Sequence, residues 1–188
     1  MQKALNISIR FTLLTTLLLG VGYPLAVTAF AHLALRDKAD GQLIYKNGQL
    51  IGSKIIGQSF TSDKYFHSRP SAAGNGYDAT SSGGSNFAQS NQKLVTRIQG
   101  DVAKYQQGGD GQPVPIDLVT ASGSGLDPDI TPAAAFFQVK HIAEVRNLSE
   151  SEVRNLVTTH IETRQFGVLG EPRVNVLALN LALDQLQK

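Results

Sequence analysis

Two serines in a glycine-rich stretch are the residues of this sequence whose types and spacing come closest to those of a chemical site. The stretch runs from Ser122 through Gly123 and Ser124 to Gly125. A glycine-rich loop between a strand and a helix can hold a phosphate, because its amides and the helix dipole face the anion. The lysine of the pattern G-x-x-x-x-G-K-[ST] is missing, however, and the acidic Asp127 follows. We therefore favour a tight turn that needs glycine, and keep the four residues as candidates for nucleotide binding.

The same serines could instead supply the nucleophile of a hydrolase. Ser122 or Ser124 would then need a base such as His141 or His160. The pattern G-x-S-x-G is absent, because a serine stands at position 122 where its first glycine would be, and no spacing ties either histidine to either serine. We therefore expect no catalytic residue in this chain, and an independent envelope serine hydrolase is the alternative.

Metal and nucleic-acid chemistry are not expected either. The chain has no cysteine, which excludes a disulfide framework and a thiolate metal site. Its four histidines show neither an H-E-x-x-H motif nor an i, i+4 pair. Without Lys3 and Arg10 the 17 basic residues fall to 15, which equals the 15 acidic residues. No basic stripe is left to hold a phosphate backbone, so we expect no bound metal and no nucleic-acid partner.

Two charged clusters could dock a partner chain. Arg69 stands before Pro70, which favours an extended backbone at the arginine. Glu171 and Arg173 lie in a second turn together with Arg164 and two glycines. Loop charges of this kind serve partner docking or are solvated or paired within their own domain, and the sequence supports both readings equally. Arg69, Pro70, Glu171 and Arg173 are the docking candidates.

The elements that would position these residues begin with one long apolar stretch. Residues 11–35 carry no formal charge over 25 positions. As a helix they would extend roughly 37 Å, beyond the hydrocarbon core of about 30 Å. Ala29-Phe30-Ala31 resembles a signal-peptide cleavage site, which leaves a secreted binding module as an alternative. The apolar core is longer than the usual ~7–15 residues of a signal peptide, so we favour an uncleaved transmembrane helix.

The flanking charges favour one orientation in the membrane. Lys3 and Arg10 precede the stretch without an acidic residue, whereas Arg36 and Lys38 on the other flank are mixed with aspartates. Lys and Arg are enriched on the cytoplasmic side. We therefore expect a cytoplasmic N-terminus over residues 1–10, a transmembrane helix over 11–35 and an extracytoplasmic domain over 36–188.

Local signals predict that this domain has an α+β fold. Asn47-Gly48 between apolar residues predicts a two-residue hairpin turn. Thr131-Pro132 predicts the start of a helix that extends to about Arg146. Ser149 and Glu152 form a capping box, which predicts the start of the next helix.

Other segments of the domain carry shorter signals. Asn91 predicts the cap of a helix that Gly108-Gly109 would end. Residues 115–119 predict a short strand, and residues 174–179 predict a later one, after which Asn180 would cap a final helix. Residues 68–90 have the composition of a linker but lie inside the domain, where such a segment is usually functional.

Several stretches, taken in order, resemble the C subunit of the bacterial Kdp-type potassium-transporting ATPase. They are Ile51-Gly52-Ser53, Ile56-Gly57-Gln58-Ser59-Phe60, the run from Tyr65 to Ala72, Ser82-Gly83-Gly84-Ser85-Asn86, the run from Asp117 to Pro128, and the run from Gly170 to Leu177. Together with the N-terminal apolar stretch, the resemblance extends over essentially the whole chain.

The resemblance implies a non-catalytic subunit of a heteromeric pump in the bacterial cytoplasmic (inner) membrane. Its partners would be a channel-like subunit that selects potassium, a P-type subunit that hydrolyses ATP, and a small third membrane subunit, all in the lipid bilayer. ATP and potassium would be handled by the complex, and we expect no cofactor on this chain. One view of the family is a catalytic chaperone that raises the ATP affinity of the hydrolysing subunit. The expected orientation favours instead a domain that covers the outer mouth of the channel-like subunit and supports assembly or activity.

Overall fold

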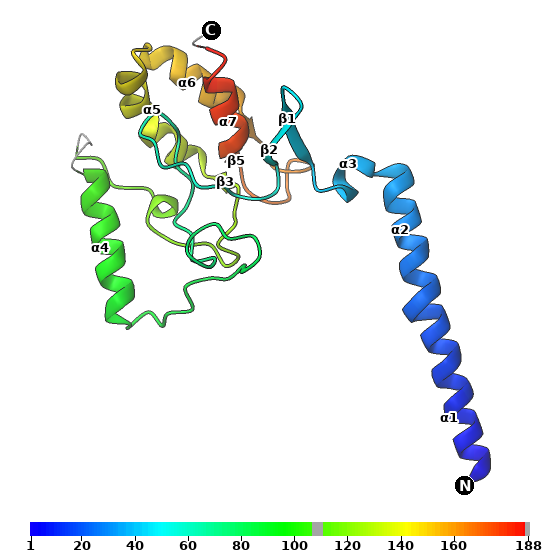
Figure 1. Ribbon diagram of the computed structural model, residues 1–188. Coiled ribbons are helices and arrows are strands. Elements are labelled where there is room, and N and C mark those ends of the chain that lie inside the picture. The colour runs from blue at the N-terminus through cyan, green and yellow to red at the C-terminus, as the bar shows by residue number, and fades with distance from the viewer. Residues whose placement is uncertain (107–110, 187–188) are drawn as a thin grey trace. The chain divides into compact units, whose positions relative to one another are not determined.

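The computed structural model describes residues 1–106 and 111–186 and divides the chain into two compact units, Met1–Leu43 and Ile44–Lys188. The first unit is dominated by one helical stretch, drawn in blue in Figure 1. It consists of α1 (Gln2–Thr15), a π-helical segment (Thr16–Gly22) and α2 (Tyr23–Ala34), and the short α3 (Arg36–Ala39) follows. The helix therefore begins earlier than the uncharged stretch that predicted it, and includes Lys3 and Arg10.

The π-helical segment ends two residues before the proline of this helix, Pro24. Pro24 has no N–H, so it cannot donate a hydrogen bond to the carbonyl of Gly20. The backbone hydrogen bonds of the preceding turns therefore depart from the regular α-helical pattern. Gln2–Ala34 is the one helix among the described residues that is long and apolar enough to cross a membrane. None of its side chains is buried in the structure, as expected for a surface that faces lipid.

A hairpin of β1 (Leu43–Lys46) and β2 (Gln49–Ser53) opens the second unit, and only the first residue of β1, Leu43, belongs to the first unit. Asn47 and Gly48 lie between the strands with φ values of 54° and 78°, the left-handed pair that such a turn requires. The turn predicted from Asn47-Gly48 is therefore confirmed.

The rest of this unit is mixed α and β, as predicted. α4 (Gln92–Gln106) is followed by a 3₁₀ turn (Ile116–Leu118), β3 (Asp129–Ile130), α5 (Pro132–Arg146), α6 (Glu150–Thr159), β4 (Ile161–Glu162), β5 (Arg173–Asn175) and α7 (Val176–Leu183). The three short strands form an antiparallel sheet in the order β3-β5-β4. In this sheet Val174 of β5 pairs with Ile130 on one side and Ile161 on the other.

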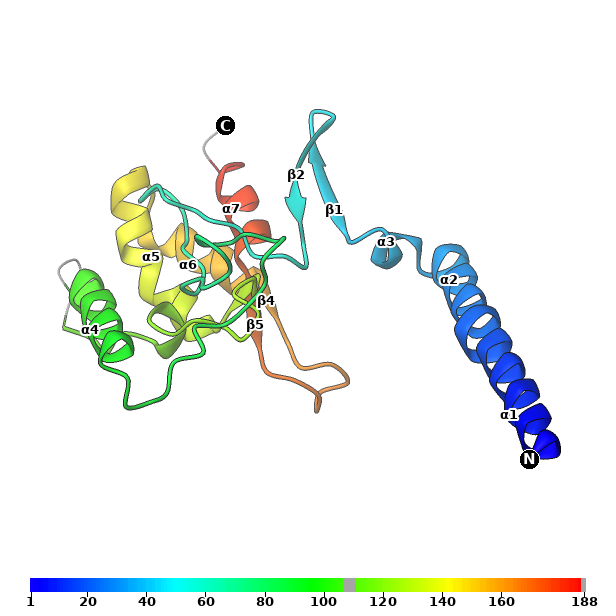
Figure 2. The ribbon, with the colours of Figure 1, turned by 60° about the horizontal axis from the view of Figure 1, so that its bottom comes forward.

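The hydrophobic core lies where three helices meet this sheet. α5 packs on α6 and α6 on α7, while β5 contacts both α5 and α7 (Figure 2). Ile142, Val157 and Leu179 are almost completely buried there, and full burial of such a side chain contributes about 1.5–3 kcal/mol. Phe66, from the long loop after β2, is also completely buried in this cluster.

The helix starts that were predicted from local signals are confirmed. The Asn91 side chain accepts from the Lys93 amide at 2.9 Å at the start of α4, and Thr131 accepts from the Ala134 amide at 3.2 Å at the start of α5. Ser149 and Glu152 form both hydrogen bonds of the capping box at the start of α6. The predicted end of the first of these helices, Gly108-Gly109, lies outside the described residues.

One predicted strand is wrong, and the later one is present but shorter than predicted. Residues 115–119 contain a 3₁₀ turn, in which the Leu118 amide donates to the Pro115 carbonyl and Asp117 accepts from the Thr131 amide. The later strand ends at Asn175, whose side chain caps α7 by accepting from Ala178. Asn180 therefore lies inside the final helix and does not cap it.

Candidate functional site

The turn from Ser122 to Gly125 is closed by its own side chains. The Ser122 hydroxyl accepts from the Gly125 amide at 2.9 Å, and the Ser124 hydroxyl accepts from the Leu126 amide at 3.1 Å. The Ser124 carbonyl in turn accepts from the Gly83 amide at 2.9 Å. The two glycine-rich stretches of the sequence therefore hold each other in place.

These hydrogen bonds occupy backbone amides that a phosphate-binding loop would offer to its anion. The amides of Gly125 and Leu126 point at serine hydroxyls of the same turn. The next regular element is β3, and the next helix, α5, begins only at Pro132. The helix dipole is thus not directly at the turn. The geometry that the structure describes for these four candidates is that of a packed turn.

The candidate serines and histidines are not assembled into a catalytic pair. Ser122 and Ser124 lie 3.4 Å apart, hydroxyl to hydroxyl. Nδ1 of His160 is 2.8 Å from the Leu156 carbonyl at the end of α6, and His141 lines a separate cavity. No serine–histidine hydrogen bond is found among residues 1–106 and 111–186 for these four side chains.

The Arg69 side chain is engaged inside the domain. Its guanidinium forms an ion pair with Asp127 at 3.0 Å and donates to the carbonyls of Thr120 and Ala121. Its own carbonyl accepts from the Tyr77 hydroxyl. These contacts tie the long loop after β2 to the 120–127 segment, and Pro70 follows in that loop with partial burial.

The second charged cluster is also paired internally. Glu171 binds Arg164 at 2.6 Å across the β4–β5 connection. Arg173 binds Glu162 at 2.8 Å and Asp129 at 3.0 Å, so one guanidinium joins all three strands of the sheet. The structure thus accounts for these charges within the domain, and their docking role stays a prediction.

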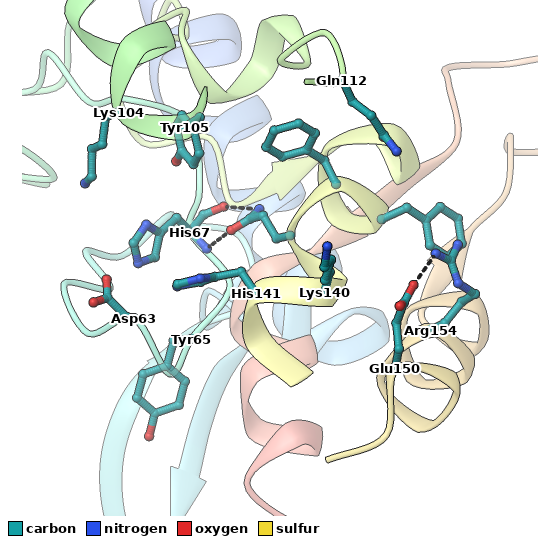
Figure 3. A pocket seen from close by; sticks show the side chains of 13 residues that line it. Asp63, Tyr65, His67, Lys104, Tyr105, Gln112, Lys140, His141, Glu150 and Arg154 are labelled. Atoms are coloured by element: carbon teal, nitrogen blue, oxygen red, sulfur yellow. Dashed lines mark hydrogen bonds and ion pairs between the residues drawn. The ribbon is translucent and has the colours of Figure 1, made fainter. Parts of the chain in front are cut away.

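A cavity of about 490 Å³ lies between α4, α5, the start of α6 and the loop after β2 (Figure 3). Its lining residues come from segments far apart in the chain: Asp63, Tyr65, His67, Lys104, Tyr105, Gln112, Phe136, Phe137, Gln138, Lys140, His141, Glu150 and Arg154. Sequence analysis missed this cavity, because no spacing of residue types links these segments.

The lining combines aromatic rings with charged groups. Tyr105 meets Phe137 edge to face with ring centroids 6.1 Å apart. Arg154 binds Glu150 at 2.9 Å, and its guanidinium lies over the Phe136 ring at 5.4 Å. Such walls suit a small aromatic or anionic group.

The surroundings of two ionisable side chains in the cavity, His67 and Tyr105, shift their pKa values. Burial lowers the pKa of His67, and nearby Lys104 acts in the same direction, while a hydrogen bond to the Ser62 carbonyl opposes them. Burial, with a smaller contribution from Asp101, raises the pKa of Tyr105 to about 12. Both side chains therefore favour their neutral forms near pH 7. No group of three or more metal-ligating side chains occurs in the described part of the chain.

The fold defines a class of protein: one N-terminal helix able to span a membrane, followed by a mixed α/β domain. The sequence model of the family described as "KdpC: K+-transporting ATPase, c chain" matches residues 5–185. The chain therefore belongs to the KdpC family, and the resemblance identified from its motifs is confirmed.

Individual relatives agree over the full length. The potassium-transporting ATPase KdpC subunit of Koribacter versatilis is 56% identical, covering 100% of this chain and 97% of the relative. Its counterpart in Acidobacterium capsulatum is 54% identical over 97% and 98% of the two chains. The Rhodopseudomonas palustris subunit is 50% identical over 98% of each.

Proposed function

We propose that this chain is a non-catalytic accessory subunit of an ATP-driven potassium uptake complex, with its domain outside the membrane over the outer mouth of the potassium-selecting subunit. The observation that carries the proposal is the match to the KdpC family over residues 5–185. The partners would be the potassium-selecting subunit, an ATP-hydrolysing P-type subunit and a small third membrane subunit. ATP and potassium would be handled by the complex.

A non-catalytic role is supported by how the candidate side chains are used. The hydroxyls of Ser122 and Ser124 accept from amides of their own turn, and Arg69 is held by Asp127 and two carbonyls. Groups that hold the fold together in this way are less available to a substrate. Assembly of the complex and support of its activity fit such a domain better than chemistry of its own.

The outer location is supported by the charges around the helix. Lys3 and Arg10 precede the most apolar part of Gln2–Ala34 without an acidic residue, which favours a cytoplasmic N-terminus in the inner membrane. A domain on the opposite side cannot contact cytoplasmic ATP. The function that remains for it is to cover or shape the entrance for potassium.

Single cysteines in this cysteine-free chain test the proposal in intact cells. Gln2→Cys leaves both flanking cations in place, and Ser90→Cys lies at an exposed position of the domain. An impermeant thiol reagent should label position 90 and leave position 2 unlabelled until the cells are permeabilised. The reverse pattern would overturn the outer location and favour the catalytic-chaperone alternative, in which the domain acts on ATP binding.

A further inference from the structure

The cavity between α4, α5, the start of α6 and the loop after β2 has the dimensions of a small-molecule site. Its volume of about 490 Å³ lies within the range of about 300–1,000 Å³ that is typical of ligand pockets. Its walls come from separate segments of the domain, as the close view shows (Figure 3). A recess with walls on several sides admits a small molecule rather than a broad protein face or a membrane surface.

Two contacts fix the shape of the cavity. Gln138 of α5 accepts from the His67 amide at 2.8 Å and donates to the His67 carbonyl at 3.1 Å. The Tyr105 ring of α4 meets the Phe137 ring of α5 edge to face. The loop and α4 are thereby held against α5. A cavity that is formed in advance loses less entropy when a ligand binds.

The charges of the lining favour an anion. Lys104, Lys140 and Arg154 contribute three positive charges. Asp63 and Glu150 contribute two negative charges, and Glu150 pairs with Arg154 at 2.9 Å. In the part of the chain that the structure describes, no carboxylate forms an ion pair with Lys104. The surplus of one positive charge favours a ligand with a single negative charge over a cation or a polyphosphate.

The negative group of such a ligand has donors at one end of the cavity. Figure 3 shows Lys104, Tyr105 and His67 at this end, away from the pair of Glu150 and Arg154. The charge of Lys104 reaches His67, where it adds to the effect of burial in lowering the pKa. Burial raises the pKa of Tyr105 to about 12, so its hydroxyl keeps its proton and can donate. An ammonium and a phenolic hydroxyl are donors that the two oxygens of a carboxylate accept.

The body of the ligand would meet aromatic rings. Four of them line the cavity: Tyr65, Tyr105, Phe136 and Phe137. The guanidinium of Arg154 lies over the Phe136 ring at 5.4 Å, so that ring already has a cationic partner. The other rings can pack against a further ring edge to face or with an offset stack. A planar aromatic ligand fits these walls better than an aliphatic one.

We propose that this cavity binds a small aromatic carboxylate, with the carboxylate at Lys104 and Tyr105 and the ring beside Phe137. The ligand bridges α4 and α5. No side chain of α4 is fully buried, so the bridge adds to the packing of this helix and stabilises the domain. The site lies within the domain and does not depend on the assembly role proposed above.

Titration of the full chain with benzoate and with the larger 2-naphthoate tests the site. The chain is purified in detergent, and the same titrations into detergent alone are subtracted. At least one probe should bind with a dissociation constant of about 1 mM or lower. Its neutral amide, benzamide or 2-naphthamide, and acetate, which has the charge without the ring, should each bind at least about fivefold more weakly. Failure of both probes to bind, or equal binding of the amide or of acetate, would overturn the proposal.

Two lysines of α4 provide a matched pair of variants. Lys104→Met removes the charge and keeps much of the apolar stem, so the probe should bind roughly fivefold more weakly or worse. Lys93→Met should leave the affinity unchanged, because Lys93 does not line the cavity. Both lysines are exposed, so both variants should unfold at the wild-type temperature. Wild-type affinity of Lys104→Met, or equal weakening by both substitutions, would contradict the placement of the carboxylate.

Discussion

Gly125 has the most constrained backbone position in the candidate turn. Its φ is +67°, and a Cβ atom would lie 2.6 Å from both the Ala73 amide nitrogen and the Gly83 carbonyl oxygen. The residue is needed because three segments meet there, which is a sufficient reason for a glycine without any ligand. The glycine pattern that suggested a phosphate loop is thus explained by close packing.

This gives a prediction for two glycines of one turn. Gly125→Ala should destabilise the full chain by about 2 kcal/mol or more, because the left-handed backbone and the contacts with Ala73 and Gly83 both oppose a methyl group. Gly123→Ala is the matched control, since a Cβ there meets nothing within 4 Å. Urea unfolding of both variants in detergent measures the difference. Equal stabilities would show that the turn is not as tightly packed as described.

Buried amide side chains fix the long loop after β2. Asn180 accepts from the Phe66 amide at 2.8 Å and donates to its carbonyl at 3.0 Å. Gln138 makes the same pair of bonds with the backbone of His67, at 2.8 and 3.1 Å. Each side-chain amide bonds both the N–H and the C=O of one loop residue, as a neighbouring β-strand would. The buried backbone of the loop is therefore fully hydrogen-bonded at these positions.

At the scale of elements, the features that could be predicted from the sequence are those whose causes are local. Asn47-Gly48, Thr131-Pro132 and the Ser149–Glu152 capping box each act within about four residues, and the structure contains all three. Helix caps and tight turns are decided by backbone groups next to the residue itself. Their residue types therefore suffice to predict them.

The features that could not be predicted depend on distant residues. Asp117 accepts from the Thr131 amide at 2.7 Å, a contact that favours a 3₁₀ turn where apolar residues predicted a strand. Asn180 looks like a helix cap in the sequence, yet its partner Phe66 is 114 residues away. The cavity beside His67 is missed for the same reason, since three separate helices supply its walls.

Ion pairs on the three-stranded sheet predict that the stability of the domain depends on pH. The pKa of Glu162 is lowered, chiefly by a hydrogen bond from Lys54; burial opposes this shift, and the charges of Lys54 and Arg173 lower the pKa further. A carboxylate with a lower pKa in the folded protein stabilises the fold above its unfolded pKa. That contribution is lost as the pH falls from about 5 through the folded pKa.

Glu162→Gln should therefore weaken the loss of stability between pH 6.5 and pH 3.5. The effect should stay below about 1 kcal/mol, because the Glu162 side chain is 37% exposed and solvent screens the pair. Glu144→Gln, at an exposed position of α5, serves as the control. Urea unfolding at the two pH values measures the change. An acid-induced loss as large as in the wild type would exclude Glu162 as a contributor.

At the scale of the whole molecule, the two units have different kinds of stability. The helix Gln2–Ala34 buries none of its side chains, so it needs lipid or partner helices around it. The second unit has its own core on α5, α6, α7 and the three-stranded sheet. In the proposed role, the helix would act as a membrane tether and the domain would supply the surface that meets the partner subunits.

Removal of the N-terminal helix separates the stability of the domain from the contribution of the helix to retention in the complex. A chain that begins at Gly41 keeps β1 and every residue of the hydrophobic core, so its domain should unfold at a temperature within about 2 °C of the full chain. Its retention by the partner subunits should nevertheless fall by roughly 10²–10⁴, because the helix no longer holds the domain at a high effective concentration beside them. Thermal unfolding and co-purification measure the two effects. If the shortened chain failed to fold, the domain would depend on the helix for part of its stability. If it were retained as well as the full chain, the domain contact alone would hold the subunit in the complex.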